Sequence, residues 1–202
     1  MKILNLYAGI GGNRKLWPDG HDITAVEFNP DIAKIYHDFF PNDTVVVGDA
    51  HQYLLEHYKE FDFIWASPPC PSHSNIRRCG VQAGQYKALY PDMALYQEIL
   101  LIQNFAPKET KYCIENVRPY YEPLIKAQNC ARHLFWTNFY LTEFKNTPVH
   151  DATMEERQKV KGFDISKYNN IDKRKTLRNC VDPKLGLHIW NCAFRDVQMD
   201  MF

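Results

Sequence analysis

Short apolar runs alternate along the chain with segments in which apolar residues recur at helical spacing. The runs are rich in Ile, Val, Leu and aromatic residues, as is typical of buried β-strands. Their alternation with helical segments predicts right-handed βαβ units, and therefore an α/β fold with a doubly wound, mostly parallel sheet covered on both faces. Five strands are expected, at Lys2–Tyr7, Asp22–Glu27, Thr44–Val47, Phe61–Ala66 and Lys111–Glu115.

Two of the intervening segments carry clear helix signals. Asn29 is suited to cap a helix, Pro30 to occupy its first position and Asp31 to lie in its first turn, so a helix is expected to run to about Tyr36. A second helix is expected over residues 93–104, whose apolar side chains share one face. Sheets of this class bind ligands at the carboxyl ends of their strands, so the polar residues there are the candidates for chemistry.

The ends of the first three strands together predict a nucleoside pocket. The glycine-rich loop 8–12 lets a ligand approach the backbone closely, although a tight strand-to-helix turn also explains its glycines. Glu27 ends the second strand and is suited to accept both hydroxyls of a ribose, and Phe28 beside it can lie against a purine. Asp49 follows the third strand, where its carboxylate can accept from an adenine amino group. The absence of a P-loop lysine pattern disfavours a nucleoside triphosphate.

Pro68-Pro69-Cys70 directly follows the fourth strand. The two prolines stiffen the backbone that presents the sulfur, and a thiolate is a strong nucleophile in an electropositive loop. Arg77 and Arg78 lie in the same loop and are expected to supply the positive field. On this tripeptide alone, an inert buried cysteine in a turn is an equal alternative.

The succession of these and later motifs resembles the cytosine-C5 DNA methyltransferase family. The resemblance runs in order along most of the chain, and motifs in order are far more specific than any one of them. The matching segments are Leu6-Tyr7-Ala8-Gly9-Ile10-Gly11-Gly12, Glu27, Asp49, Ser67-Pro68-Pro69-Cys70-Pro71-Ser72-His73-Ser74, Glu115-Asn116-Val117, Arg132-His133-Leu134-Phe135 and Arg178-Asn179-Cys180-Val181-Asp182-Pro183-Lys184-Leu185.

The resemblance implies the class I S-adenosylmethionine-dependent (Rossmann-like) fold and the transfer of a methyl group from S-adenosylmethionine to carbon 5 of cytosine in DNA, with S-adenosylhomocysteine as product. It implies that Cys70 adds to carbon 6, that Glu115 donates a proton at N3, that Asn116 orients this site and that Arg132 holds the O2 edge and the adjacent phosphate. The base has to swing out of the duplex to reach them.

The same resemblance assigns the binding residues. The loop after Cys70 is expected to close over the extruded nucleotide, and the expected DNA contacts are Ser74, Arg77, Arg78 and Arg118. The expected cofactor-binding residues are Tyr7, Ala8, Gly9, Gly11, Gly12, Glu27, Phe28, Asp49, Ala50, Pro69, Asn179 and Val181.

The chain also departs from the family pattern. Ser67 replaces the usual glycine of the catalytic motif, Pro71 the glutamine and His73 the aromatic residue. Segment 137–177 is too short for the target-recognition domain that family members insert there. We therefore expect one near-minimal catalytic domain over 1–202, of a phage- or mobile-element-like kind, in which 178–202 returns to the cofactor pocket.

Composition limits how such a chain binds DNA. The formal net charge of the 202 residues is zero, so local cationic clusters have to carry the binding, although each cluster also fits a solvated face. The six cysteines and eight histidines lack metal-ligand spacing, and no metal is expected. No signal peptide or membrane-length apolar run is present, so a cytoplasmic enzyme with reduced thiols and no membrane partner is expected.

Three hypotheses follow from the sequence. The first is an active DNA cytosine-5 methyltransferase, as in phage or restriction-modification systems. The second is a non-catalytic S-adenosylmethionine-binding subunit whose protein partner supplies recognition, although the presence of both Cys70 and Glu115 argues against it. The third keeps the chemistry but acts on RNA or uses a modified donor.

Overall fold

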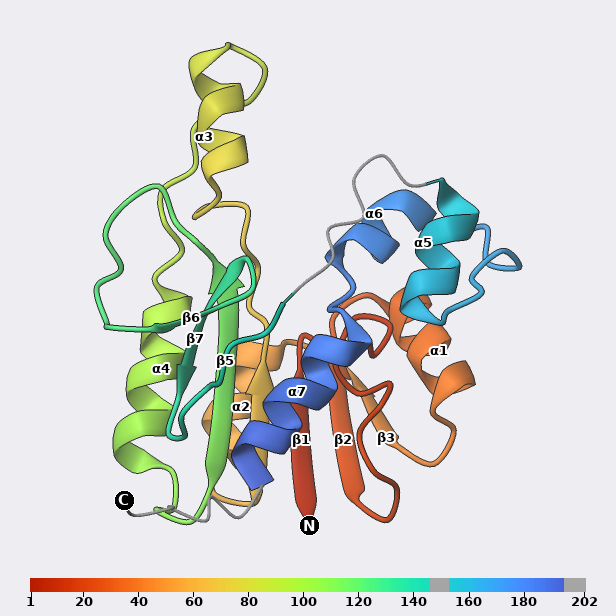
Figure 1. Ribbon diagram of the computed structural model, residues 1–202, viewed down its shortest axis with the longest axis vertical. Helices are drawn as coiled ribbons and strands as arrows, with labels where there is room; N and C mark the ends of the chain where they lie inside the picture. The colour runs from red at the N-terminus through yellow and green to blue at the C-terminus, as the bar shows by residue number, and fades with distance from the viewer. Residues whose placement is uncertain (146–152, 195–202) are drawn as a thin grey trace.

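The computed structural model describes residues 1–145 and 153–194, and within them a single seven-stranded sheet has the order β3-β2-β1-β4-β5-β7-β6 (Figure 1). Strands β1 to β5 are parallel, whereas β7 is antiparallel to both β5 and β6. The strands are β1 Lys2–Leu6, β2 Asp22–Glu27, β3 Thr44–Val47, β4 Phe63–Ala66, β5 Lys111–Val117, β6 Gln128–Cys130 and β7 His133–Thr137. The helices are α1 Pro30–Phe39, α2 Ala50–His57, α3 Asn75–Gln82, α4 Ala94–Phe105, α5 Met154–Lys161, α6 Lys173–Asn179 and α7 Pro183–Phe194.

The predicted elements are confirmed, and further ones are added. The five expected strands form the parallel part of the sheet, and the two expected helices are α1 and α4. Asn29 caps α1 by accepting from the backbone N–H groups of Asp31 and Ile32, with Pro30 in its first turn. The sequence analysis predicts neither the antiparallel pair β6–β7 nor helices α2, α3, α6 and α7.

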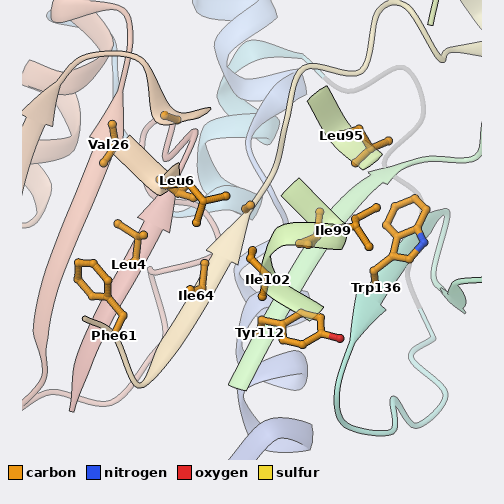
Figure 2. Packing of buried hydrophobic residues seen from close by; sticks show 14 of the residues in the cluster. Leu4, Leu6, Val26, Phe61, Ile64, Leu95, Ile99, Ile102, Tyr112 and Trp136 are labelled. Carbon is orange, nitrogen blue, oxygen red and sulfur yellow. The ribbon is translucent and has the colours of Figure 1, made fainter. Parts of the chain in front are cut away.

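Helices cover both faces of the sheet. On one face, α2 and α4 pack on residues such as Leu4, Ile64 and Tyr112, and Figure 2 shows Ile99 and Ile102 of α4 pointing into this cluster. On the other face, α7 packs on the alternate residues of the same strands, which include Ile3, Phe63, Trp65 and Cys113. Because both faces are buried, every position of β4 is apolar, and the polar residues of β1 are limited to Lys2 at its exposed start and to Asn5.

Two helical projections extend beyond the carboxyl ends of the strands (Figure 1). One is α3, and on the other side of the same end lie α5 and α6, which follow segment 137–145. Phe163 and Ile165, between α5 and α6, are fully buried against Ile10 and Ile35, so this part of the insert packs on the glycine loop and on α1. Within the described ranges, no helix is long and apolar enough to cross a membrane.

Candidate functional site

The glycine loop after β1 and the end of β2 are joined by Glu27. Its carboxylate accepts from the backbone N–H of Gly9 at 3.0 Å and from that of Asn29 at 2.9 Å. Gly9 has a φ of +55°, and the space into which its side chain would extend is empty. Phe28 is 77% exposed beside it. Glu27 therefore shapes the loop, and a ligand can approach Gly9 directly, as the sequence predicts.

Asp49 caps α2 with one carboxylate oxygen and leaves the other oxygen without a hydrogen bond from the described residues. Its Oδ1 accepts from the backbone N–H groups of His51 at 2.8 Å and Gln52 at 3.1 Å, and these are the only hydrogen bonds that the described residues give this side chain. Ala50 is buried at the first position of the helix, and Ala8 is buried in the glycine loop. The free Oδ2 can still accept from a ligand.

A buried acid, which sequence reasoning misses, lies beneath this site. Glu98 of α4 is 1% exposed, and its Oε1 accepts from the Tyr7 hydroxyl at 2.5 Å and lies 2.9 Å from His51 Nδ1. Burial, followed by the Glu98 charge, raises the pKa of Tyr7 well above its ordinary value. Tyr7 has a φ of +55°, so the hydroxyl contact helps to hold a backbone conformation that L residues rarely adopt. A lone acid among the apolar positions of the helix predicted at 93–104 is the signal that could have identified Glu98.

The segment after α6 lies directly on the glycine loop. A side chain at Gly12 would come within 2.3 Å of the Val181 carbonyl oxygen and 2.5 Å of Cys180 Sγ. Gly186 of α7 is equally close to the backbone of Asn13, and Gly11, at φ +82°, lies against Phe40 and Tyr36. Asn179 is exposed at the end of α6 and Val181 is half-buried. Residues near the two ends of the chain thus form one surface.

This close approach predicts a strong effect of Gly12→Ala. The added Cβ would overlap the backbone of the 180–181 segment, and we expect a loss of about 1–3 kcal/mol in the free energy of unfolding, together with weaker cofactor binding. Urea unfolding and calorimetric titration with S-adenosylmethionine measure the two effects. Gly48→Ala is the matched control, because its nearest neighbour would be 3.9 Å away. Equal unfolding midpoints for Gly12→Ala and the wild type would contradict the packing described here.

The loop that carries Cys70 is fixed to β5. Asn116 donates from Nδ2 to the Pro68 carbonyl oxygen at 3.1 Å. His73 is 1% exposed, and its Nδ1 lies 2.5 Å from the Tyr121 hydroxyl, so the residue that replaces the usual aromatic still anchors the loop. Cys70 is half-buried and Pro69 is exposed. Cys70 is therefore neither a fully buried nor a fully exposed residue.

Glu115 lies at the carboxyl end of β5 and is nearly buried. Its Oε2 accepts from the Ser67 hydroxyl at 2.8 Å, and the Ser67 oxygen accepts from the Trp65 indole N–H at 2.8 Å. Its Oε1 lies 3.2 Å from His133 Nδ1. The sequence analysis assigns Glu115 to the site but neither Ser67 nor His133, which become its neighbours only when β7 pairs with β5 and the β4 end lies alongside.

Charges at these strand ends act on the Cys70 thiol. Burial, followed by the Glu115 charge, raises its pKa, whereas Arg178 and Arg132 lower it. The thiol therefore keeps its proton at neutral pH in the free protein. Arg132 is exposed in the turn between β6 and β7, and Arg178 is exposed near the end of α6. The sequence analysis expects the positive field from the loop itself, but the structure shows these two cations acting on the sulfur.

The loop arginines are engaged in the projection that contains α3. Arg77 Nη2 donates to the Lys87 carbonyl oxygen at 3.1 Å, and its guanidinium lies over the Tyr86 ring. Arg78 Nη1 donates to the Tyr120 carbonyl oxygen at 3.1 Å and its guanidinium lies over that ring. Both arginines, with Ser74, line a pocket of about 150 Å³. Neither forms an ion pair with a described carboxylate, so their positive charge is available to an anion.

Arg118 belongs to a different surface. It donates to the Ala131 carbonyl oxygen at 3.2 Å and lines a pocket of about 410 Å³ together with Lys126 and Asn129. The sequence analysis groups Arg118 with the loop arginines as a DNA contact, but the structure gives it a separate set of neighbours.

Comparisons with known proteins bear on the family and the fold of the chain. A sequence profile described as "C-5 cytosine-specific DNA methylase" matches residues 1–123. No match was found among curated proteins. The chain is similar in structure to a methyltransferase of Entamoeba histolytica, with 12% identity and a TM-score of 0.59 over 96% of this chain and 98% of that one.

Two further solved structures match over smaller parts of this chain and of their own chains. An S-adenosylmethionine-dependent methyltransferase from Agrobacterium tumefaciens matches with 11% identity and a TM-score of 0.44, over 60% of this chain and 40% of that one. A DNMT2 variant from Spodoptera frugiperda matches with 23% identity and a TM-score of 0.38, over 57% of this chain and 35% of that one. The match to the Entamoeba protein shows a shared fold over nearly the whole described chain.

Proposed function

The chain belongs to the C-5 cytosine-specific DNA methylase family, and on that premise we propose that it methylates carbon 5 of cytosine in DNA through a covalent bond between Cys70 and carbon 6. It has the class I S-adenosylmethionine-dependent methyltransferase fold, and S-adenosylmethionine is the methyl donor. The roles of individual residues, including Arg132 and Asn179, which lie outside the matched stretch, belong to the proposal.

One observation carries the proposal. The half-buried residue Cys70 follows β4, the buried carboxylate of Glu115 lies near the carboxyl end of the neighbouring parallel strand β5, and the Asn116–Pro68 and Ser67–Glu115 hydrogen bonds join the loop after β4 to β5. A nucleophile beside a proton donor is the pair that addition to a cytosine ring requires.

The residues around the glycine loop fit the cofactor. The open space above Gly9, the free Oδ2 of Asp49 and the exposed ring of Phe28 are suited to an adenosyl group, with Glu27 at its ribose. When bound, S-adenosylmethionine supplies an electrophilic methyl group on its sulfonium. We propose that Asn179 and Val181, whose segment packs on Gly12, cover the site from the other side.

In the proposed reaction, Cys70 is the nucleophile and Glu115 is the proton donor. The Cys70 thiol first loses its proton to solvent, and Sγ then bonds to carbon 6 while Glu115 gives a proton to N3, so the ring is neutral and carbon 5 becomes enamine-like and able to accept the methyl group. The carbon 5 proton then leaves to solvent, the N3 proton returns to Glu115 and the sulfur is released, which restores the aromatic ring. Glu115 contributes twice, because in its neutral form it no longer raises the pKa of the Cys70 thiol.

The projections in Figure 1 are the proposed DNA interface. Residues 63–91 contain no acidic side chain and include Arg77, Arg78 and Lys87, so this segment is suited to phosphates. Arg174 and Arg178 are exposed on α6, in the other projection. We propose that 1–202 acts as one catalytic domain, with 137–177 as a short insert in place of a recognition domain, and that any longer sequence specificity comes from a protein partner.

Nucleoside mass spectrometry tests the function. DNA and RNA from cells that make the protein are compared with those from cells that make Cys70→Ser. We expect the level of 5-methyl-2′-deoxycytidine to rise in DNA from cells that make the wild-type protein and not in DNA from cells that make Cys70→Ser. A rise confined to RNA, or a different modified base, would overturn the proposal.

A further inference from the structure

The Ser67 hydroxyl fixes which oxygen of Glu115 can carry a proton. An indole N–H only donates, so the Ser67 oxygen, which accepts from Trp65 at 2.8 Å, has to direct its own proton elsewhere. That proton goes to Glu115 Oε2, also at 2.8 Å. Oε2 is therefore an acceptor, and a proton on the Glu115 carboxyl resides on Oε1.

His133 lies at the remaining oxygen. Its Nδ1 is 3.2 Å from Oε1, yet it is buried and forms no aligned hydrogen bond with any described residue. An imidazole nitrogen and a carboxylate oxygen at this distance avoid lone-pair repulsion only if one of them is protonated. Because the contact is close but unaligned, Oε1 can still turn its proton to a third group.

The charges around His133 set its state. Burial lowers its pKa, and Glu115 of β5 acts against this, while Arg132 of the β6–β7 turn, Lys161 of α5 and Arg118 after β5 lower it further. The Glu115 charge also raises the pKa of the Cys70 thiol in the loop after β4, and Arg178 of α6 lowers it. His133 is therefore neutral at neutral pH.

We propose that Ser67 and His133 are positioning residues for the acid, with Ser67 holding Oε2 and His133 sharing the Oε1 proton. The inference rests on the proposed role of Glu115. In the protonated pair, the proton on Oε1 lies beside Nδ1 of the neutral His133 ring, and it passes from Oε1 to cytosine N3 as Sγ bonds to carbon 6. His133 stays neutral throughout, and Glu115 ends as a carboxylate. Because the chain has Ser67 where the family has glycine, this arrangement is a property of this chain.

The pH profile of single-turnover methyl transfer tests the pair. His133→Asn keeps a hydrogen-bond donor near the position of Nδ1 but has no titratable group. Ser67→Gly removes the hydroxyl. His37→Asn, on the exposed face of α1, is the matched control for the histidine substitution. We expect His133→Asn to move the alkaline limb of the profile toward acid by about one pH unit or more, because the carboxyl alone then has to hold the proton. Ser67→Gly should lower the rate roughly 10-fold at every pH, since it frees Oε2 and the Trp65 N–H. Profiles of His133→Asn and His37→Asn that coincide with the wild type would overturn the inference.

Two further results separate this inference from the proposed function. If Glu115→Gln transfers methyl groups at the wild-type rate, the proposed role of Glu115 itself is overturned. If Glu115→Gln is inactive but His133→Asn has the same pH profile as the wild type, only the coupling of His133 to Glu115 is overturned. If His133→Asn does not fold, the His133 ring titration is followed by NMR in the wild type and in Glu115→Gln. A different His133 titration in Glu115→Gln supports the pair, and identical titrations overturn it.

Discussion

Cys70→Ser is expected to lower methyl transfer roughly 10⁴-fold or more while leaving S-adenosylmethionine binding nearly unchanged. A serine hydroxyl is far less ionised and less nucleophilic than a thiol, so the bond to carbon 6 no longer forms. The cofactor contacts lie at the ends of β1, β2 and β3, and none of the described contacts there involves the sulfur. Single-turnover assays and calorimetric titration measure the two properties separately.

Cys79→Ser is the matched control for this variant, because Cys79 is exposed on α3 in the same segment. It should transfer methyl groups at close to the wild-type rate. Equal loss of transfer and of cofactor binding in Cys70→Ser would contradict the assignment of Cys70 as a nucleophile, as would full activity of this variant.

Glu115→Gln is expected to lower the rate by about 10²–10⁴-fold. The amide keeps the size of the side chain and can still accept from the Ser67 hydroxyl, but it has no proton of suitable acidity for N3. The loss should appear in the rate of the bond-forming step and leave cofactor affinity unchanged. Glu155→Gln, at an exposed position in the first turn of α5, is the control. A Glu115→Gln rate equal to that of Glu155→Gln would show that N3 is protonated by another group.

The parallel part of the fold was predictable because its signals are local. Apolar runs at the right length and the cap at Asn29 do not depend on distant residues, and they give β1 to β5, α1 and α4. The antiparallel strands were not predictable in this way. β6 has three residues, and β7 begins at His133, inside a stretch that the motif pattern already accounts for. Their existence depends on pairing with β5, which is a tertiary contact.

The same limit applies to the site. Residues at strand ends, such as Glu27, Asp49, Cys70 and Glu115, can be identified because a parallel sheet gathers the carboxyl ends of its strands. Glu98, His133 and Arg178 reach the site from α4, β7 and α6 by packing. The packing of the 180–181 segment on Gly12 joins residues far apart in the sequence, so no local pattern specifies it, and it was expected only from the family resemblance of residues 178–185.

Trapping on 5-fluorocytosine DNA tests the central claim most directly, because fluorine at carbon 5 prevents the elimination that releases the sulfur. The protein is incubated with the fluorinated duplex and S-adenosylmethionine, digested and analysed by mass spectrometry. We expect a peptide containing Cys70 that carries the methylated nucleotide, and no adduct in Cys70→Ser. Finding no covalent adduct on the wild-type protein, or an adduct on another cysteine, would contradict it.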